Sequence, residues 1–145
     1  MAIKQISVFL ENRAGALEGA VRVLAEAGVD MRAMSIADTQ EFGILRLIVR
    51  EHEAACAALR EAGYILAVND VTAVEIPDEP GGLARVVGIL TAAGINIEYS
   101  YAFLTQSHGR ACVVLRVDDN GKAAEALAAA GIETLTSGEG GQLPL

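Results

Sequence analysis

The chain has 145 residues and a formal net charge of −8, and 52% of its residues are hydrophobic. This apolar content favours a packed core over disorder, and the length suits one ordinary domain or two small ones. The negative charge argues against nucleic acid or an anionic membrane as partner, because both attract basic proteins. No apolar run approaches the roughly 20 residues of a membrane-spanning helix, and the start lacks a signal peptide's apolar stretch, so we expect a cytoplasmic protein.

Periodic apolar residues predict six elements in the first half of the chain. Ile6, Val8 and Leu10 recur at every second position, as in a strand, whereas Leu17 and Leu24 recur at helical spacing. The predicted elements are a strand at 4–11, a helix at 15–28, strands at 30–38 and 44–50, a helix at 53–62 and a strand at 64–69. Glycines at the ends of both helices are typical helix stops.

The second half of the chain repeats the first. Gly15 and Gly81 lie 66 residues apart, and "VLAEAGVDM" matches "ILTAAGINI" at the same spacing. Beyond the following hairpin the spacing grows to 68, as for Leu47 and Leu115, so the two extra residues fit a hairpin tip near "TQSHGR". The repeat predicts a strand at 71–77, a helix at 81–93, strands at 96–105 and 110–117, a helix at 122–130 and a strand at 132–136.

The order of these elements is βαββαβ in each half, the ferredoxin-like arrangement. We therefore predict an α+β protein of two such units, each an antiparallel sheet with both helices on one face. The first unit spans 1–69 and the second 70–145, and Asn69 and Asp70 are expected to form a bend between them. Residues 137–145 are a glycine-rich tail.

The face of each predicted sheet that carries no helix needs a cover of its own. This open face is too apolar for full exposure and too charged for a deep core. We expect the sister unit, a second chain or both to cover it; the alternative is edge pairing that leaves it partly exposed. Tyr99, Tyr101 and Phe103 share one strand face and fit the contact between units or a ligand pocket. The open face includes Phe9, Ile44, Arg46, Ile48, Ala73, Cys112, Val114 and Arg116.

Catalytic and metal-binding residues are not expected. His52 and His108 have no nucleophile or carboxylate at a recognisable spacing, apart from Cys56, which lies four residues after His52 and fits a core position better. No CxxC or His/Cys cluster is present, so a zinc or redox site has little support and no cofactor is predicted. "SGEGG" lacks the preceding strand and following helix of a nucleotide-binding loop.

Two similar corners, "ENRAGAL" at 11–17 and "DEPGGL" at 78–83, each join a strand to a helix. The free N–H groups of a helix start bind anions, so those of residues 15–17 and 81–83 could hold a carboxylate. Asn12 and Asp78 are placed to cap the helices or to accept from an ammonium group. Asp30 and Asn96 begin the next strand and are expected to offer a second polar contact. The corners thus fit a free α-amino acid, unless the glycines only form turns.

The motifs "ISVFLENRAGAL…VLAEAGVDM" and "VTAVEIPDEPGGL…ILTAAGINI" resemble two ACT domains, which are amino-acid-binding regulatory modules. The resemblance implies modules that pair through their sheets, with ligands at the pair interface against the glycine loop. The first strand is also similar to regulatory subunits of acetolactate synthase. Ala14 stands where the motif usually has proline, which Pro80 keeps, so the first site is expected to be looser. The implied ligand-binding residues are Asn12, Arg13, Ala14, Gly15, Ala16, Leu17, Asp30, Met31, Asp78, Glu79, Pro80, Gly81, Gly82, Leu83, Asn96 and Ile97.

The resemblance favours a non-catalytic regulatory protein that binds a free amino acid and forms a homodimer. One alternative is a regulatory subunit of a biosynthetic enzyme such as acetolactate synthase. Another is a dimerisation module without a ligand.

Overall fold

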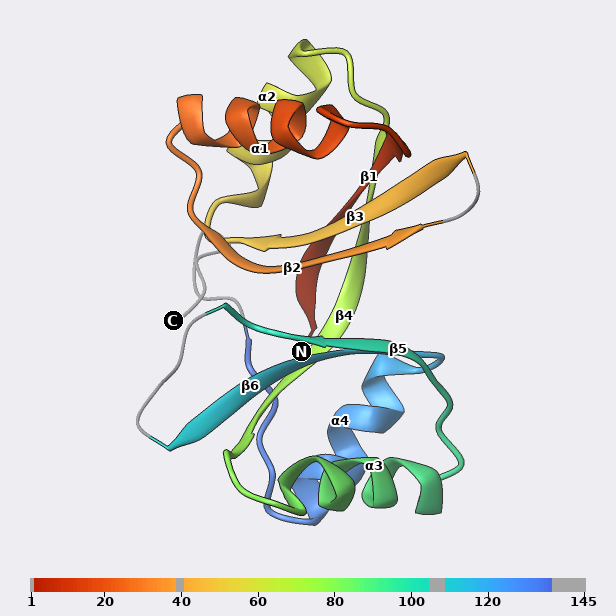
Figure 1. The fold of residues 1–145 in the computed structure, drawn as a ribbon. Coiled ribbons are helices and arrows are strands. Elements are labelled where there is room, and N and C mark those ends of the chain that lie inside the picture. Colours follow the sequence, from red (N-terminus) through yellow and green to blue (C-terminus); the bar gives the residue numbers. More distant parts are fainter. Residues whose placement is uncertain (1, 39–40, 105–108, 137–145) are drawn as a thin grey trace.

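The computed structural model describes residues 2–38, 41–104 and 109–136. The predicted α+β architecture of two ferredoxin-like units is confirmed (Figure 1). The predicted hairpin-tip insertion with His108 and the tail at 137–145 lie outside the described residues. The elements are β1 (Ile3–Glu11), α1 (Ala16–Glu26), β2 (Met31–Asp38), β3 (Phe42–Val49), α2 (His52–Glu61), β4 (Leu66–Pro77), α3 (Gly82–Ala92), β5 (Ile97–Ala102), β6 (Arg110–Val117) and α4 (Asn120–Ala129).

The predicted glycine stops end all four of these helices. After α1, Gly28 has φ 70°, and the N–H of Val29 donates to the carbonyl of Leu24 at 3.0 Å. A residue in this left-handed conformation turns the chain back, so that the last helical carbonyls find donors. The same pattern follows α2, α3 and α4 at Gly63, Gly94 and Gly131.

One strand, β4, belongs to both units. The strand order is β2-β3-β1-β4-β6-β5; β4 pairs with β1 up to Val71 and with β6 from Thr72 onward. The predicted bend at Asn69 and Asp70, with separate strands at 64–69 and 71–77, is therefore wrong. Pairing with β1 and an ion pair from Lys4 Nζ to Asp70 Oδ1 at 2.7 Å hold this stretch extended, although both residues favour turns.

The predicted strands at 132–136 and 96–105 are also not formed at full length. At the first, a single bridge joins Val74 to Thr134, because the turn after α4 sends Ile132 into the core and only the next residues reach the edge of β4. At the second, β5 ends at Ala102; the N–H of Phe103 still donates to the Cys112 carbonyl at 2.9 Å, and Phe103 also bridges Ala33 of the first unit.

The molecule has four layers, with a helix pair outside each sheet and the two sheets facing each other (Figure 1). We call the contact between the sheets the seam. It buries apolar residues from both units, among them Ile3, Ile48, Val71, Ala73, Phe103, Cys112 and Val114. The prediction that the sister unit covers the open face is thus confirmed for this part, whereas Phe9 is 47% exposed and Ile44 is half-buried.

A polar cluster lies in the middle of the seam. Gln5 is fully buried; its Nε2 donates to Tyr99 Oη at 2.7 Å, and its Oε1 accepts from Tyr101 Oη at 2.5 Å. The guanidinium of Arg46 stacks on the Tyr99 ring, 3.8 Å from its centroid. Tyr99 and Tyr101 therefore serve the contact between units, which is one of the two roles predicted for them.

The helices in the described part of the chain are all too short or too polar to span a lipid bilayer.

Candidate functional site

The two glycine corners have nearly the same backbone geometry. Gly15 has φ 87° and ψ −14°, and Gly81 has φ 90° and ψ −11°. Side chains are strained at such positive φ values, which explains glycine at both positions. The replacement of proline by Ala14 in the first corner leaves this turn geometry unchanged. Both corners are exposed, so a ligand can reach the backbone there.

The glycines themselves are the N-cap residues of α1 and α3, without a side-chain cap. The expectation that Asn12 and Asp78 cap these helices is therefore wrong. Each lies three residues before its glycine, and its backbone N–H bonds to a neighbouring strand end instead: Asn12 to Glu41 O and Asp78 to Gly109 O, both at 2.9 Å. These bonds hold the entry to each corner against the hairpin of the same unit.

The free donors of each helix start overlap the predicted ones only in part. The N–H groups of Ala16 and Gly82 are engaged by carbonyls of their own turns, at 3.3 and 3.1 Å. The first intrahelical bonds run from Gly19 to Gly15 and from Arg85 to Gly81, both at 3.0 Å. The N–H groups of residues 17–18 and 83–84 precede those bonds, and together with the helix dipole they favour an anion.

The second corner opens into a pocket of about 670 Å³ that mixes charged and apolar groups. Such a volume is within the usual range for small-molecule sites. Arg110 Nε pairs with Glu75 Oε1 at 2.6 Å, and an Arg85 NH2 group donates to the Ala130 carbonyl at 3.2 Å. Glu79 and Glu133 add two more carboxylates to the lining. Cationic and anionic groups thus converge beside one helix start.

The first corner opens into a smaller and more apolar pocket of about 480 Å³. Phe9, Phe42, Tyr64 and Ile65 line it together with Gly15 and Ala16. Its charged lining residues, Glu11 and Arg13, form an ion pair with each other. The two corners therefore share one backbone geometry but differ in the volume and the chemistry of the pockets beside them.

Of the predicted site residues, seven line these pockets: Arg13, Gly15, Ala16, Glu79, Pro80, Gly81 and Gly82. Asn12, Ala14, Leu17, Asp78 and Leu83 belong to the same corners but do not line the pockets. Leu17 packs against the first core, whereas Leu83 is 43% exposed.

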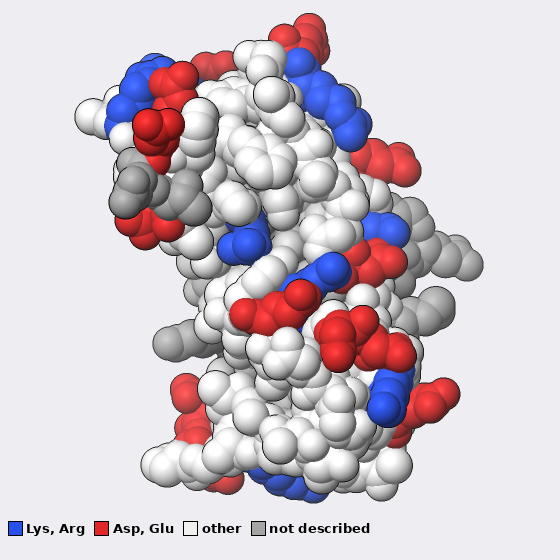
Figure 2. All heavy atoms as spheres, turned by 90° about the vertical axis from the view of Figure 1, so that its right-hand side faces the viewer, with Lys and Arg blue, Asp and Glu red and all other residues white. Residues whose placement is uncertain are grey.

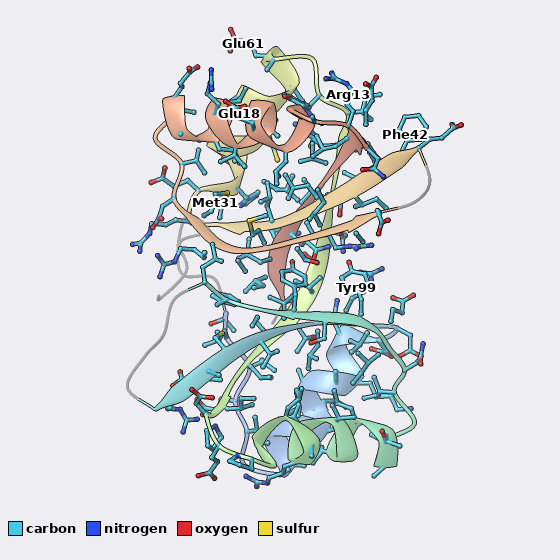
Figure 3. The ribbon with its side chains drawn as sticks, in the orientation of Figure 1. Arg13, Glu18, Met31, Phe42, Glu61 and Tyr99 are labelled. Atoms are coloured by element: carbon cyan, nitrogen blue, oxygen red, sulfur yellow. The ribbon has the colours of Figure 1, made fainter. Side chains whose placement is uncertain are left out.

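The strand-start residues Asp30, Met31, Asn96 and Ile97 lie away from both corners, and the expected proximity is wrong. Met31 pairs with Val49 at one end of β3, whereas the last residue of β1 pairs with Phe42 at the other end. Figure 3 shows Arg13 and Phe42 together at one end of the first unit and Met31 at the opposite end. Asp30 pairs there with Arg32 and Arg50. Met31 and Ile97 pack against the cores of their units, and Ile97 pairs with Val117, again far from the corner of its unit.

Comparison with known proteins identifies the family. A family model described as ACT domain pair matches residues 1–139. The chain belongs to the ACT domain-pair family. No curated protein matches this chain. The similarity of the first unit to acetolactate synthase regulatory subunits is not shown by these comparisons.

Solved structures match the ACT domain pair over most of its length. Protein BT0572 from Bacteroides thetaiotaomicron is 37% identical with a TM-score of 0.87, and the match covers 93% of this chain and 92% of that one. The regulatory subunit of aspartate kinase from Thermus thermophilus, in its ligand-free form, is 20% identical with a TM-score of 0.66, and the match covers 90% of this chain and 93% of that one. The regulatory subunit of aspartate kinase from Thermus flavus is 18% identical with a TM-score of 0.62, and the match covers 90% of this chain and 94% of that one. The last two matches show the fold alone.

The first corner of the ACT domain pair lies away from the seam between its own units, and the second pocket meets the seam at Leu135. Each pocket is lined by residues of a single unit. The seam lies at the start of β1, around Ile3, whereas the first corner follows the end of that strand at Glu11. The paired sheets of this chain therefore do not enclose either pocket, and a ligand at a pair interface stays a prediction.

Residues that sequence reasoning missed complete the two pockets. The start of β6 supplies Arg110 and the segment after α4 supplies Glu133 in the second pocket; Phe42 and Ile65 stand at the corresponding places in the first. Among the described residues no group of three His, Cys, Asp or Glu side chains could hold a metal ion.

The thiol of Cys112 is expected to be inert in the folded protein. Burial raises its pKa to about 12, and the nearby Glu75 carboxylate adds to this rise. At about pH 8 the buried group therefore carries less reactive thiolate than the unfolded chain. In a Cys56→Ala variant, Ellman's reagent should modify Cys112 slowly without denaturant and rapidly in urea. Because the unfolded thiol ionises at lower pH, the free energy of unfolding also falls as the pH rises towards 12. Equal reaction rates in both states would contradict this burial.

Proposed function

We propose that this ACT domain pair is a non-catalytic regulatory protein that binds a free α-amino acid and acts as a homodimer in the cytoplasm. The observation that carries the proposal is the second pocket, where an open helix start, arginines and carboxylates converge in about 670 Å³. A free amino acid carries one carboxylate and one ammonium group, and such a pocket offers partners for both.

The second corner supports a defined binding mode. The N–H groups of residues 83–84 and the helix dipole favour the carboxylate of the ligand. Arg85 and Arg110 strengthen this positive field, whereas Glu79 is exposed at the rim and fits the ammonium group. Ile76, Val86 and Ile132 supply an apolar wall for the ligand's side chain. At the first corner, Arg13 stands where the second has Glu79, so we propose the second corner as the primary site.

A thermal-shift screen of the twenty amino acids tests this function. Binding to the folded state alone raises stability by mass action, by about 2.7 kcal/mol at a ligand concentration of 100 Kd. We expect at least one amino acid to raise the melting temperature in a saturable way. Glu79→Gln should weaken that binding about tenfold or more, because a hydrogen bond to a charged group contributes about 1.5–3 kcal/mol.

Glu125→Gln is the matched control for this experiment. Glu125 is an exposed carboxylate of the same unit, on α4, and does not line the pocket. This variant should keep the wild-type affinity. Should no amino acid shift the melting curve, the ligand proposal fails and a ligand-free dimerisation module becomes the better description. Equal loss in both variants would place the ligand elsewhere.

The alternative is a regulatory subunit of an amino-acid biosynthetic enzyme such as acetolactate synthase. Exposed aromatic residues of the first unit, Phe9 and Phe42, favour a protein partner of some kind. Affinity capture from a lysate of the source organism tests this alternative: recovery of a biosynthetic enzyme in a stable ratio supports it. Recovery of the chain alone contradicts it.

A further inference from the structure

The open face of the first sheet has an apolar row that the described residues of the second unit do not cover. We call the side chains of Ile65, Phe9, Ile44 and Ala37 the outer row. They lie beside one another across three strands of the first unit and the residue before β4: Phe9 pairs with Ile44, Ile44 pairs with Ala37, and the Phe9 N–H donates to the Ile65 carbonyl at 3.0 Å. Phe42 extends the row along β3.

The outer row is unusually exposed for residues of this kind. Phe9 is 47%, Phe42 54% and Ile65 73% exposed. Figure 2, which views the side where β1 ends, shows a broad uncharged area over the first unit with charged side chains at its margins. A contiguous apolar surface of this sort marks an interaction site, whereas single exposed apolar residues do not.

The outer row continues an interface that is already formed. Ile3 and Ile48 belong to the same face of the same sheet and are buried under the second unit. Between Ile48 and the outer row lies one polar row, in which Arg46 pairs with Ser7 and stacks on Tyr99. This face therefore already packs against an antiparallel sheet of the same fold, and only its outer part lacks a cover.

The second unit shows that the fold does not require apolar residues at these places. By the repeat spacing of 66 and then 68 residues, Glu75 stands where the first unit has Phe9. In the same way, Arg110 occupies the position of Phe42, and Glu133 occupies the position of Ile65. Glu75 and Arg110 form an ion pair. The counterparts of Phe9, Phe42 and Ile65 in the second unit are therefore charged, whereas those of Ile44 and Ala37 are Cys112 and Phe103, which are buried in the seam. An exposed apolar surface at these places is thus found in the first unit.

We propose that the outer row binds the outer row of a second copy of this chain, with the first-unit sheets packed face to face about a two-fold axis. This rests on the homodimer of the proposed function and assigns its surface. An apolar, uncharged patch matches itself, as a two-fold contact requires. The equivalent surface of a partner's second unit carries the Glu75–Arg110 ion pair, whose desolvation would be costly against phenylalanine.

Sedimentation velocity over a range of concentrations tests this surface. We expect the wild-type chain to form a dimer, and Phe9→Glu and Ile65→Glu to weaken it by about 30-fold or more, the effect of losing a central contact of about 2 kcal/mol. Both variants introduce the residue that the second unit carries at the same place, so the fold tolerates them. Leu104→Glu is the matched control: Leu104 is 56% exposed, outside the row, and its replacement adds the same charge.

The outcomes separate the surface from the function. Dimeric wild-type and Leu104→Glu proteins with monomeric Phe9→Glu and Ile65→Glu support the proposal. A wild-type dimer that neither variant weakens overturns the surface but leaves the homodimer in place. A monomeric wild-type chain overturns both, while the amino-acid screen still reports on the ligand independently. Far-ultraviolet circular dichroism checks that each variant is folded.

Discussion

Gly82→Ala is expected to lower the free energy of unfolding by about 1–3 kcal/mol, the usual cost of forcing an extra carbon into packed structure. A Cβ added at Gly82 would lie 2.4 Å from the carbonyl oxygen of Pro77, which is backbone and has no rotamer to move to. The start of α3 must therefore shift away from the end of β4. Because this movement distorts the second corner, amino-acid binding should weaken as well. Chemical denaturation and the thermal-shift titration measure the two effects separately.

Gly88→Ala provides the control on the same helix. An added Cβ there meets nothing within 4 Å, and Gly88 lies inside α3. Alanine is preferred to glycine in helix interiors by about 0.5–1 kcal/mol, so this variant should be more stable than the wild type. If Gly82→Ala were as stable as the wild type, the backbone of the second corner would be able to move away from the added carbon at little cost, contrary to this prediction. The first corner carries Ala16 at the matching position, so the two corners differ in the space behind the helix start.

Gln5→Leu is expected to destabilise the protein by about 1–3 kcal/mol, because it removes the partner of two hydroxyl groups in the seam. The amide of Gln5 bonds Tyr99 at 2.7 Å and Tyr101 at 2.5 Å, and it is fully buried. Burial also raises the pKa of Tyr101, with a smaller contribution from Tyr99, so its hydroxyl stays a proton donor to Gln5. Urea denaturation measures the loss.

A paired variant distinguishes lost hydrogen bonds from lost packing. Gln5→Leu combined with Tyr101→Phe removes a donor and its acceptor together, so no unpartnered hydroxyl remains at that position. Replacement of both partners by apolar groups is often nearly neutral. We therefore expect the double variant to be more stable than Gln5→Leu alone. If it is less stable by the sum of both single losses, the hydroxyl of Tyr101 does not act through Gln5.

The architecture was predictable because the same pattern occurs twice. Periodic apolar residues and a glycine after each helix predict each helix within a few residues, since core packing and helix ends are local properties of the sequence. The bend predicted at Asn69 and Asp70 was wrong because the structure of this stretch is not set by a local property of the sequence. Their preference for turns is local, but pairing of this stretch with β1 is a tertiary contact and overrides it.

The candidate site was predictable only in part. Gly15 and Gly81 mark the corners because their positive φ leaves a signal in the sequence. The neighbours of the corners were misplaced: Asp30 and Asn96 follow next in the chain, but β2 and β5 are not adjacent to the strands that carry the corners. In each unit the strand that pairs with the corner strand begins beside the corner, at Phe42 or at Arg110. The strand order of the ferredoxin-like fold therefore predicts these two residues beside the corners, whereas the order of the elements along the chain does not.

The continuous β4 has a consequence for the handling of this protein. Its first half pairs with β1 at the edge of the first sheet, and its second half pairs with β6 and forms a single bridge to Thr134 in the second. If the chain were cut at the repeat boundary, the backbone hydrogen bonds between β1 and β4 near the cut would be lost, and each half would expose its side of the seam. Because the two repeats share one strand and one seam, chimaeras between relatives should exchange the whole pair instead of one repeat.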